Sequence, residues 1–238
     1  MFDAGNIGQG GRTTCGDQNV ARRDALAVHV GGDEAVKDQW EASARVQARM
    51  RDVGAGDEME MQSHIIKRLE TFLEQHDRRL IGWDEILDGG LPPEATVMSW
   101  RGIEGGITAA NLGHDVVMSP NSYFYLDYYQ ADPKTEPLAI GGLLPLSKSY
   151  SFEPNLPELT AEEAKHVVGI QANVWTEYIS NIAYAEYMTY PRALALSEVA
   201  WSTKESKNYA DFKKRLTGHL PAMDALKINY SKAFLAQP

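Results

Sequence analysis

Residues 25–34 read ALAVHVGGDE, an apolar segment of strand length that runs into two glycines and two adjacent carboxylates. Val28 and Val30 favour a buried strand, and the glycine pair ends it with a backbone freedom that other residues lack. Asp33 and Glu34 would then lie at the carboxyl end of the strand, where parallel α/β folds place their chemistry. Successive side chains point in different directions, so one carboxylate can stay ionised while the other, less solvated, acts as an acid. A solvated acidic turn is the alternative interpretation of the pair alone.

The composition bounds the class of protein. The chain has 238 residues, of which 43% are hydrophobic, enough for a substantial core in one domain. A net charge of −10 argues against nucleic acid and anionic membrane as partners, because both bind basic faces. Cys15 is the only cysteine, which excludes an intrachain disulfide. No apolar run approaches the ~20 residues of a membrane span, and no signal peptide is visible at the start, so the compartment stays open.

Short apolar segments alternate with helical patterns along the chain. This alternation predicts a parallel sheet with helices outside it. Residues 1–24 are polar and glycine-rich and are expected to be irregular, and residues 132–159 are expected to form a long loop. The expected strands are 25–30, 79–83, 96–100, 115–119 and 167–172, and the expected helices are 57–78, one starting near 105, 193–200 and 209–216.

Three of the expected strands end in a tryptophan with a carboxylate nearby. These residues are Trp83, Trp100 and Trp175. Any one of them alone is more typical of a core residue. The repeated pairing favours a carbohydrate pocket, because sugar C–H faces stack on aromatic rings while sugar hydroxyls donate to carboxylates.

The motifs resemble glycoside hydrolase family 20, the β-N-acetylhexosaminidases, whose signature is similar to residues 29–34. The resemblance covers most of residues 25–202 and implies a (β/α)8 barrel with its site at the carboxyl ends of the strands. It also implies β-linked N-acetylhexosaminide glycans or chitooligosaccharides as substrates, and neither a cofactor nor a metal. The further matching segments follow in the same order: 82–87, 99–102, 125–127, 175–177, 190–192 and 198–202.

The resemblance assigns roles to three catalytic residues. In this family the 2-acetamido oxygen of the substrate itself attacks the anomeric carbon. Glu34 would protonate the leaving oxygen and then activate water, and Asp33 would orient the acetamide N–H and stabilise the positive intermediate. Tyr125 would donate a hydrogen bond to the acetamide oxygen.

The resemblance also implies a set of residues that bind the sugar. Trp83, Trp100 and Trp175 would enclose the acetamido group and the ring, and Asp127 and Glu177 would hold ring hydroxyls. The neighbouring His29 is expected to be a buried structural residue, with a supporting contact to the two carboxylates as the alternative. A metal site at His29, Asp33 and Glu34 is not expected, because this spacing lacks a convincing third ligand.

The chain departs from the family pattern at its beginning. The Asp-Glu pair ends the fourth barrel strand in the family but stands at position 33 here, and the sugar-binding arginine of the first strand has no recognisable counterpart among Arg12, Arg22 and Arg23. We therefore expect residues 25–238 to form a partial TIM-type barrel of about five parallel strands with outer helices, completed by a homodimer or a higher oligomer. The alternative function is that of a non-catalytic, sugar-binding remnant of the same barrel.

Overall fold

The computed structural model describes residues 27–236, so the expected irregular segment 1–24 lies outside the described residues. The chain divides into two compact units. The first unit comprises the described residues up to Ser99 together with Glu104–Val117 and Leu159–Val168. The second comprises Trp100–Ile103, Met118–Glu158 and the residues from Gly169 on.

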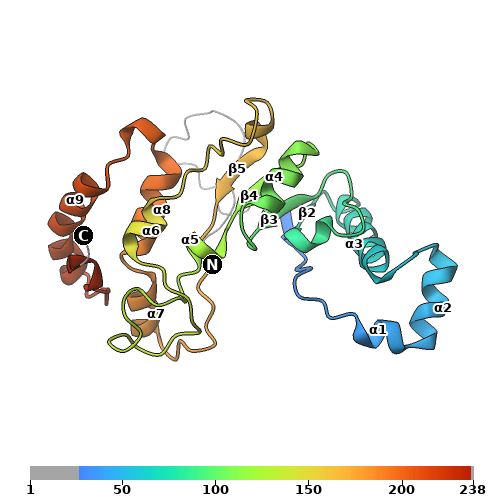
Figure 1. The fold of residues 1–238 in the computed structure, drawn as a ribbon, viewed down its shortest axis with the longest axis horizontal. Helices are drawn as coiled ribbons and strands as arrows, with labels where there is room; N and C mark the ends of the chain where they lie inside the picture. The colour runs from blue at the N-terminus through green and yellow to red at the C-terminus, as the bar shows by residue number, and fades with distance from the viewer. Residues whose placement is uncertain (1–26, 237–238) are drawn as a thin grey trace. The chain divides into compact units, whose positions relative to one another are not determined.

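Five strands form one sheet in the order β1-β2-β3-β4-β5, which is also their order along the chain (Figure 1). β1 pairs in parallel with β2, and β2 pairs in parallel with β3. Parallel neighbours that follow one another in sequence are the arrangement of consecutive βα units of a barrel. The prediction of an α/β fold with five parallel strands is therefore confirmed. The strands are β1 (Ala27–His29), β2 (Arg79–Trp83), β3 (Thr96–Ser99), β4 (Val116–Met118) and β5 (Val167–Ile170).

Two side-chain caps start the longer helices of the first unit. Ser43 Oγ accepts a hydrogen bond from the backbone N–H of Val46 at the start of α2, and Asp57 Oδ1 accepts one from that of Glu60 at the start of α3. The expected helix 57–78 is confirmed as α3, whereas α1 and α2 were not predicted. The helices are α1 (Asp38–Ala42), α2 (Ala44–Val53), α3 (Glu58–Glu74) and α4 (Glu104–Asn111), with 3-10 turns η2 (Asp84–Leu87) and η3 (Glu163–His166).

The second unit is mainly helical. The expected long loop 132–159 is broken by a short helix, α6, and the segment before Pro191 forms α7, which was not predicted. The expected helices 193–200 and 209–216 are present as α8 and a longer α9. The elements are α5 (Asn121–Phe124), α6 (Leu146–Tyr150), α7 (Ile182–Thr189), α8 (Arg192–Trp201), α9 (Tyr209–Ala225), η4 (Lys204–Ser206) and η5 (Ala233–Leu235).

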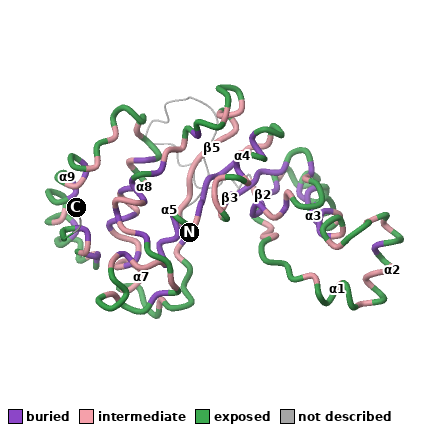
Figure 2. Tube along the Cα trace, in the orientation of Figure 1, coloured by how far each residue is buried: buried purple, intermediate pink, exposed green. Residues whose placement is uncertain are grey.

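The core of each unit is apolar. All residues of β3 and β4 are buried, and they form the purple part of the trace around the middle of the sheet (Figure 2). Ala109 and Ala110 of α4 are buried in the first unit, and Phe124, Leu126 and Leu144 are buried in the second. Among the described residues no helix has the length and apolar character needed to cross a bilayer.

The first strand, β1, and the helix α3 are less covered than the sequence predicts. Val28 is 39% exposed, because β1 lies at the end of the strand order and only β2 is its neighbour in the sheet. On α3, Ile65, Leu69 and Phe72 are 38%, 37% and 56% exposed, although their spacing is that of a core-facing stripe. The prediction of a buried first strand is therefore wrong for the described part of the chain.

Candidate active site

Two glycines shape the turn that follows β1. The backbone carbonyl of Gly31 accepts a hydrogen bond of 2.9 Å from the N–H of Trp83, so pairing with β2 continues past the end of the strand. Gly31 and Gly32 have φ values of 74° and 105°, a region that side chains disfavour. A Cβ on Gly32 would lie 2.6 Å from Cγ2 of Ile86. Both the conformation and the close packing therefore require glycine at position 32.

The two carboxylates follow this turn directly. Asp33 and Glu34 are both exposed to solvent. Glu34 has a φ of 47°, which is uncommon for a residue with a side chain and costs of order 1 kcal/mol or more. The turn thus presents two neighbouring carboxylates to solvent beside the carboxyl end of a parallel strand.

His29 supports the turn from the strand side. Its Nδ1 accepts a hydrogen bond of 3.1 Å from the N–H of Gly31, and its ring meets the edge of Trp83 with the ring centroids 4.9 Å apart. Trp83 itself is buried. Desolvation lowers the pKa of His29, and the negative charge of Asp33 partly opposes this effect. His29 is exposed to solvent, so the prediction of a buried histidine is wrong. Its contacts with Gly31 and Trp83 nevertheless support the turn.

Three aromatic residues of the second unit form what we call the aromatic cluster: Trp100, Tyr125 and Trp175. The rings of Trp100 and Tyr125 are stacked, with centroids 6.0 Å apart and planes inclined by 17°. The ring of Trp175 also contacts the ring of Tyr125, with the two ring centroids 6.2 Å apart. Tyr125 is 8% exposed and Trp175 is 38% exposed, so the cluster is anchored in the core and reaches the surface.

Backbone pairing positions the aromatic cluster. Asn173 donates its backbone N–H to the carbonyl of Phe124 at 2.9 Å and accepts the N–H of Leu126 at 2.8 Å, which holds Tyr125 between them in a parallel bridge. The side-chain amide of Asn173 donates to Ser119 Oγ at 2.8 Å in the buried interior. The segment that contains Tyr125 is therefore paired with the segment that precedes Trp175.

Asp127 is the buried carboxylate of this region. It is 4% exposed, and its Oδ1 has no hydrogen-bond partner. Burial raises the pKa of Asp127 to about 6, and the charge of the exposed Glu177 acts in the same direction. Arg192 and the backbone N–H groups of Asp127 and Trp175 oppose this shift. A buried carboxylate oxygen without a donor is suited to accept a hydrogen bond from a ligand hydroxyl.

The residues expected at the site fall into two groups. Asp33, Glu34 and Trp83 belong to the first unit, and the aromatic cluster, Asp127 and Glu177 belong to the second. In the first group, Trp83 donates its backbone N–H to Gly31 in the turn that carries the two carboxylates. In the second group, Tyr125 contacts both tryptophans of the aromatic cluster. Their union in one pocket, and the role of each residue, stay predictions.

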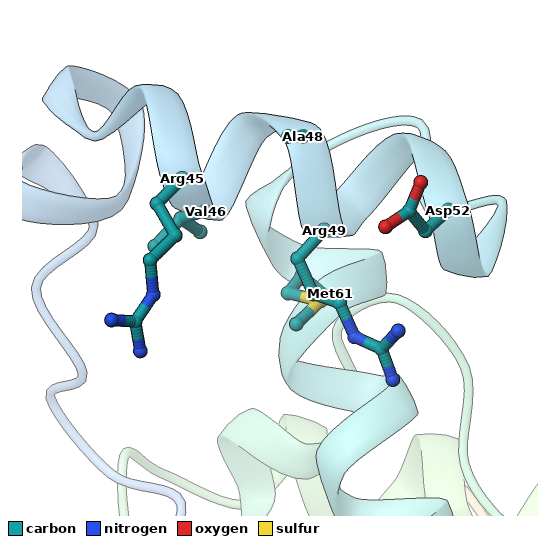
Figure 3. Close-up of a pocket in the computed structure, with 6 residues that line it drawn as sticks. All are labelled: Arg45, Val46, Ala48, Arg49, Asp52 and Met61. Carbon is teal, nitrogen blue, oxygen red and sulfur yellow. The ribbon is translucent and has the colours of Figure 1, made fainter.

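An open pocket of about 510 Å³ lies elsewhere, between α2 and α3 (Figure 3). Figure 3 shows that Arg45 and Arg49 extend from α2 on the same side, with Met61 of α3 close to Arg49. None of the expected site residues lines this pocket. Its other lining residues are Val46, Ala48 and Asp52. Among the described residues there is also no group of three or more His, Cys, Asp or Glu side chains that could hold a metal ion.

A family model described as "Glycosyl hydrolase family 20, catalytic domain" matches residues 19–204. The chain belongs to glycoside hydrolase family 20. This match confirms the resemblance expected from the motifs. It also agrees with the parallel sheet, because the family's catalytic domain is the eight-stranded barrel that the resemblance implies.

Proteins named β-hexosaminidase match most of this chain. A β-hexosaminidase of Porphyromonas gingivalis is 50% identical over 211 residues, which are 88% of this chain and 27% of the relative. A β-hexosaminidase of Vibrio furnissii is 33% identical over 181 residues, 74% of this chain and 30% of the relative. The chain thus spans less than a third of the length of either protein.

Solved structures of family 20 enzymes share the fold. The exo-β-N-acetylglucosaminidase of Vibrio harveyi, in complex with N-acetylglucosamine, superimposes with a TM-score of 0.79 at 34% identity. The match covers 88% of this chain and 33% of that one. The prediction of a partial TIM-type barrel is confirmed by this likeness together with the five parallel strands.

One residue of this region was quoted in a motif but received no role in the sequence analysis. Arg192 is completely buried, and its guanidinium donates to four backbone carbonyls. Arginine is rarely buried to this extent, so nothing in the sequence other than its place in the 190–192 motif indicated its importance.

Proposed function

We propose that this chain carries the two catalytic carboxylates of an exo-acting β-N-acetylhexosaminidase that releases terminal N-acetylglucosamine or N-acetylgalactosamine. The proposal rests above all on the turn at Gly31–Glu34, in which two glycines place Asp33 and Glu34 after the carboxyl end of the parallel strand β1. The substrates are β-linked N-acetylhexosaminide glycans or chitooligosaccharides, and the reaction retains the anomeric configuration.

The chemistry proceeds in two steps. First, the acetamido oxygen of the substrate attacks the anomeric carbon, the glycosidic bond breaks, and Glu34 gives its proton to the leaving oxygen. Asp33 accepts the acetamide N–H and stabilises the positive charge of the cyclic intermediate, while the hydroxyl of Tyr125 donates to the acetamide oxygen. Then water attacks the anomeric carbon, Glu34 takes the proton of that water, and the acetamide is restored.

The second unit supplies the groups suited to hold the sugar. The stacked rings of the aromatic cluster offer apolar faces to the acetamido group and the ring. Asp127 Oδ1 is buried without a donor, and a ring hydroxyl would satisfy it. In this proposal Glu177 holds a further hydroxyl, and Trp83 encloses the acetamido group.

A second candidate is sugar binding without turnover. It is favoured by the exposure of Asp33 and Glu34, because a general acid usually keeps its proton through burial. A homodimer or higher oligomer that covers β1 would shield this turn from solvent. The two candidates thus differ in turnover rather than in the ligand.

A release assay on the full chain separates the candidates. The wild type is compared with Glu34→Gln and with Glu41→Gln, which removes an exposed carboxylate of α1 and serves as the matched control. We expect release from a chromogenic N-acetylglucosaminide, a loss of about 10²–10⁴-fold in Glu34→Gln, and no loss in the control. Absence of wild-type turnover together with N-acetylglucosamine binding would favour the second candidate. Full activity of a folded Glu34→Gln variant would refute the role of Glu34.

A further inference from the structure

Arg192 is the largest completely buried side chain among the described residues. Its Nη2 donates to the carbonyls of Leu126 and Met188, both at 2.6 Å. Its Nη1 donates to the carbonyls of Tyr128 and Leu144, both at 3.1 Å. The guanidinium therefore joins the segment after α5, the segment before α6 and the helix α7.

Arginine is the side chain that this environment requires. A planar guanidinium presents its donors in a rigid fork, whereas the ammonium of lysine is a single point on a flexible stem. One nitrogen cannot reach all four carbonyls that the two terminal nitrogens of Arg192 reach. Loss of the fork would leave buried carbonyls without donors, which is costly in the interior.

Two of the four carbonyls flank Asp127. Leu126 precedes it, Tyr128 follows it, and the N–H of Tyr128 also donates to the carbonyl of Tyr125 at 3.2 Å. The same guanidinium thus fixes the backbone on both sides of the buried carboxylate. Since Tyr125 ends the preceding helical turn, the position of its ring depends on this backbone too.

The charge of Arg192 also acts on Asp127. Burial lowers the pKa of Arg192 to about 9, so the guanidinium is still positive at neutral pH. Asp127, Glu136 and Tyr187 are the acidic groups that face it. Asp127 in turn faces Glu177, Tyr128 and Arg192, of which only Arg192 favours its ionised form.

We propose that Arg192 is a positioning residue for sugar recognition: it holds the backbone at Leu126 and Tyr128 and thereby places the carboxylate of Asp127 to accept a ring hydroxyl. This inference rests on the proposed function, in which Asp127 holds the sugar. It assigns to Arg192 a role beyond stabilising the fold.

The test follows Asp127 directly in the full chain. Samples labelled with 13C-aspartate are titrated by NMR, Asp127→Asn identifies the Asp127 carboxyl signal, and the Kd of N-acetylglucosamine is measured on the same samples. Arg192→Met removes both the guanidinium hydrogen-bond donors and the positive charge. Arg192→Lys removes the forked guanidinium but keeps the charge. Tyr150→Phe is the control, because Tyr150 is buried in the same unit and hydrogen-bonds Glu198 and Asn208 but not the segment of Asp127.

The two Arg192 variants have different expected results. In Arg192→Met the pKa of Asp127 rises above its wild-type value of about 6, since the one favourable charge is gone. In Arg192→Lys the amide signals of residues 126–128 shift, and the Kd of the sugar increases roughly tenfold or more, the equivalent of one hydrogen bond to a charged group. Tyr150→Phe lowers the melting temperature and changes none of these readouts.

The proposal is overturned if a folded Arg192→Lys variant keeps the amide signals of residues 126–128 and the wild-type affinity. It is also overturned if its changes are matched by Tyr150→Phe, which would make Arg192 merely structural. If Arg192→Met does not fold, the lysine variant still decides the matter. The titration and the amide signals need no turnover, so a wild type without glycosidase activity would refute the proposed function and leave this test intact.

Discussion

Replacing Gly32 by alanine should destabilise the protein through two separable effects. The first is conformational, because φ is 105° at this position and a Cβ there costs about 1–3 kcal/mol. The second is steric, because the new Cβ would lie 2.6 Å from Cγ2 of Ile86, a residue that is 1% exposed and has little room to move. Overpacking of this kind costs about 1–3 kcal/mol. Together, Gly32→Ala should lower the free energy of unfolding by about 2–6 kcal/mol.

Urea denaturation of the wild type and four variants separates the two effects. Gly54→Ala is the matched control, since Gly54 has a φ of 76° and nothing lies within 4 Å of its added Cβ. It should show the conformational cost alone, about 1–2 kcal/mol. In the background of Ile86→Ala, which lacks the clashing methyl, Gly32→Ala should cost less than in the wild type, and the difference is the coupling energy of the pair.

The reasoning would be refuted by a Gly32→Ala variant no less stable than Gly54→Ala. Strict additivity with Ile86→Ala would refute the steric part alone. A folded Gly32→Ala variant should also lose activity, because the turn that carries Asp33 and Glu34 cannot keep its conformation.

Three further predictions concern chemistry, pH and assembly. Asp33→Asn should impair hydrolysis of N-acetylated substrates without unfolding the chain, and the wild type should ignore plain glucosides; efficient cleavage of a 2-hydroxy glucoside in parallel kinetic assays would contradict substrate assistance. Asp127 has a folded pKa of about 6, above that of an unfolded aspartate, so its ionisation should reduce stability as the pH rises from about 4 to about 6. Asp127→Asn should remove this loss and be about 1–2 kcal/mol more stable than the wild type at pH 7, after allowance for solvent screening. If urea denaturation gives the same dependence of stability on pH for the variant and the wild type, this prediction is wrong. Light scattering at low micromolar concentration should find a homodimer or higher oligomer, because Val28 and the α3 stripe are exposed; a stable, cooperatively folding monomer would show that the chain needs no partner.

The elements that were predictable from the sequence are those in which local pattern and tertiary environment agree. Arg79–Trp83 is a strand over the expected residues, and Asp57 caps α3 where the periodic pattern begins. α1 and α2 were not predicted; their sequences are polar on average, and only Met50 of them is buried. Helices that bury so little leave few apolar residues from which a pattern can be recognised.

The candidate site shows the same division. The turn from Gly31 to Glu34 could be predicted from the sequence, because the two glycines that end the strand stand next to it in the chain. Burial depended on neighbours far away in the sequence: His29 and Val28 are exposed because of the place of β1 in the strand order. Arg192 contacts carbonyls between 4 and 66 positions away, and no local pattern predicts a guanidinium in the interior.

The hydrogen bonds from Arg192 to main-chain oxygens fix the backbone of residues 126–128 independently of the side chains that these residues carry. Every amino acid has a backbone carbonyl, so Leu126 and Tyr128 can accept the hydrogen bonds of Arg192 whatever side chain occupies position 127. Position 127 is thereby free to change from carboxylate to amide, or to a longer acid, while the main chain beneath it keeps its course. Under the proposed function, a single substitution at position 127 can then alter the preference among sugar epimers while the segment stays folded. A change at position 192 would instead alter every residue of that segment at once.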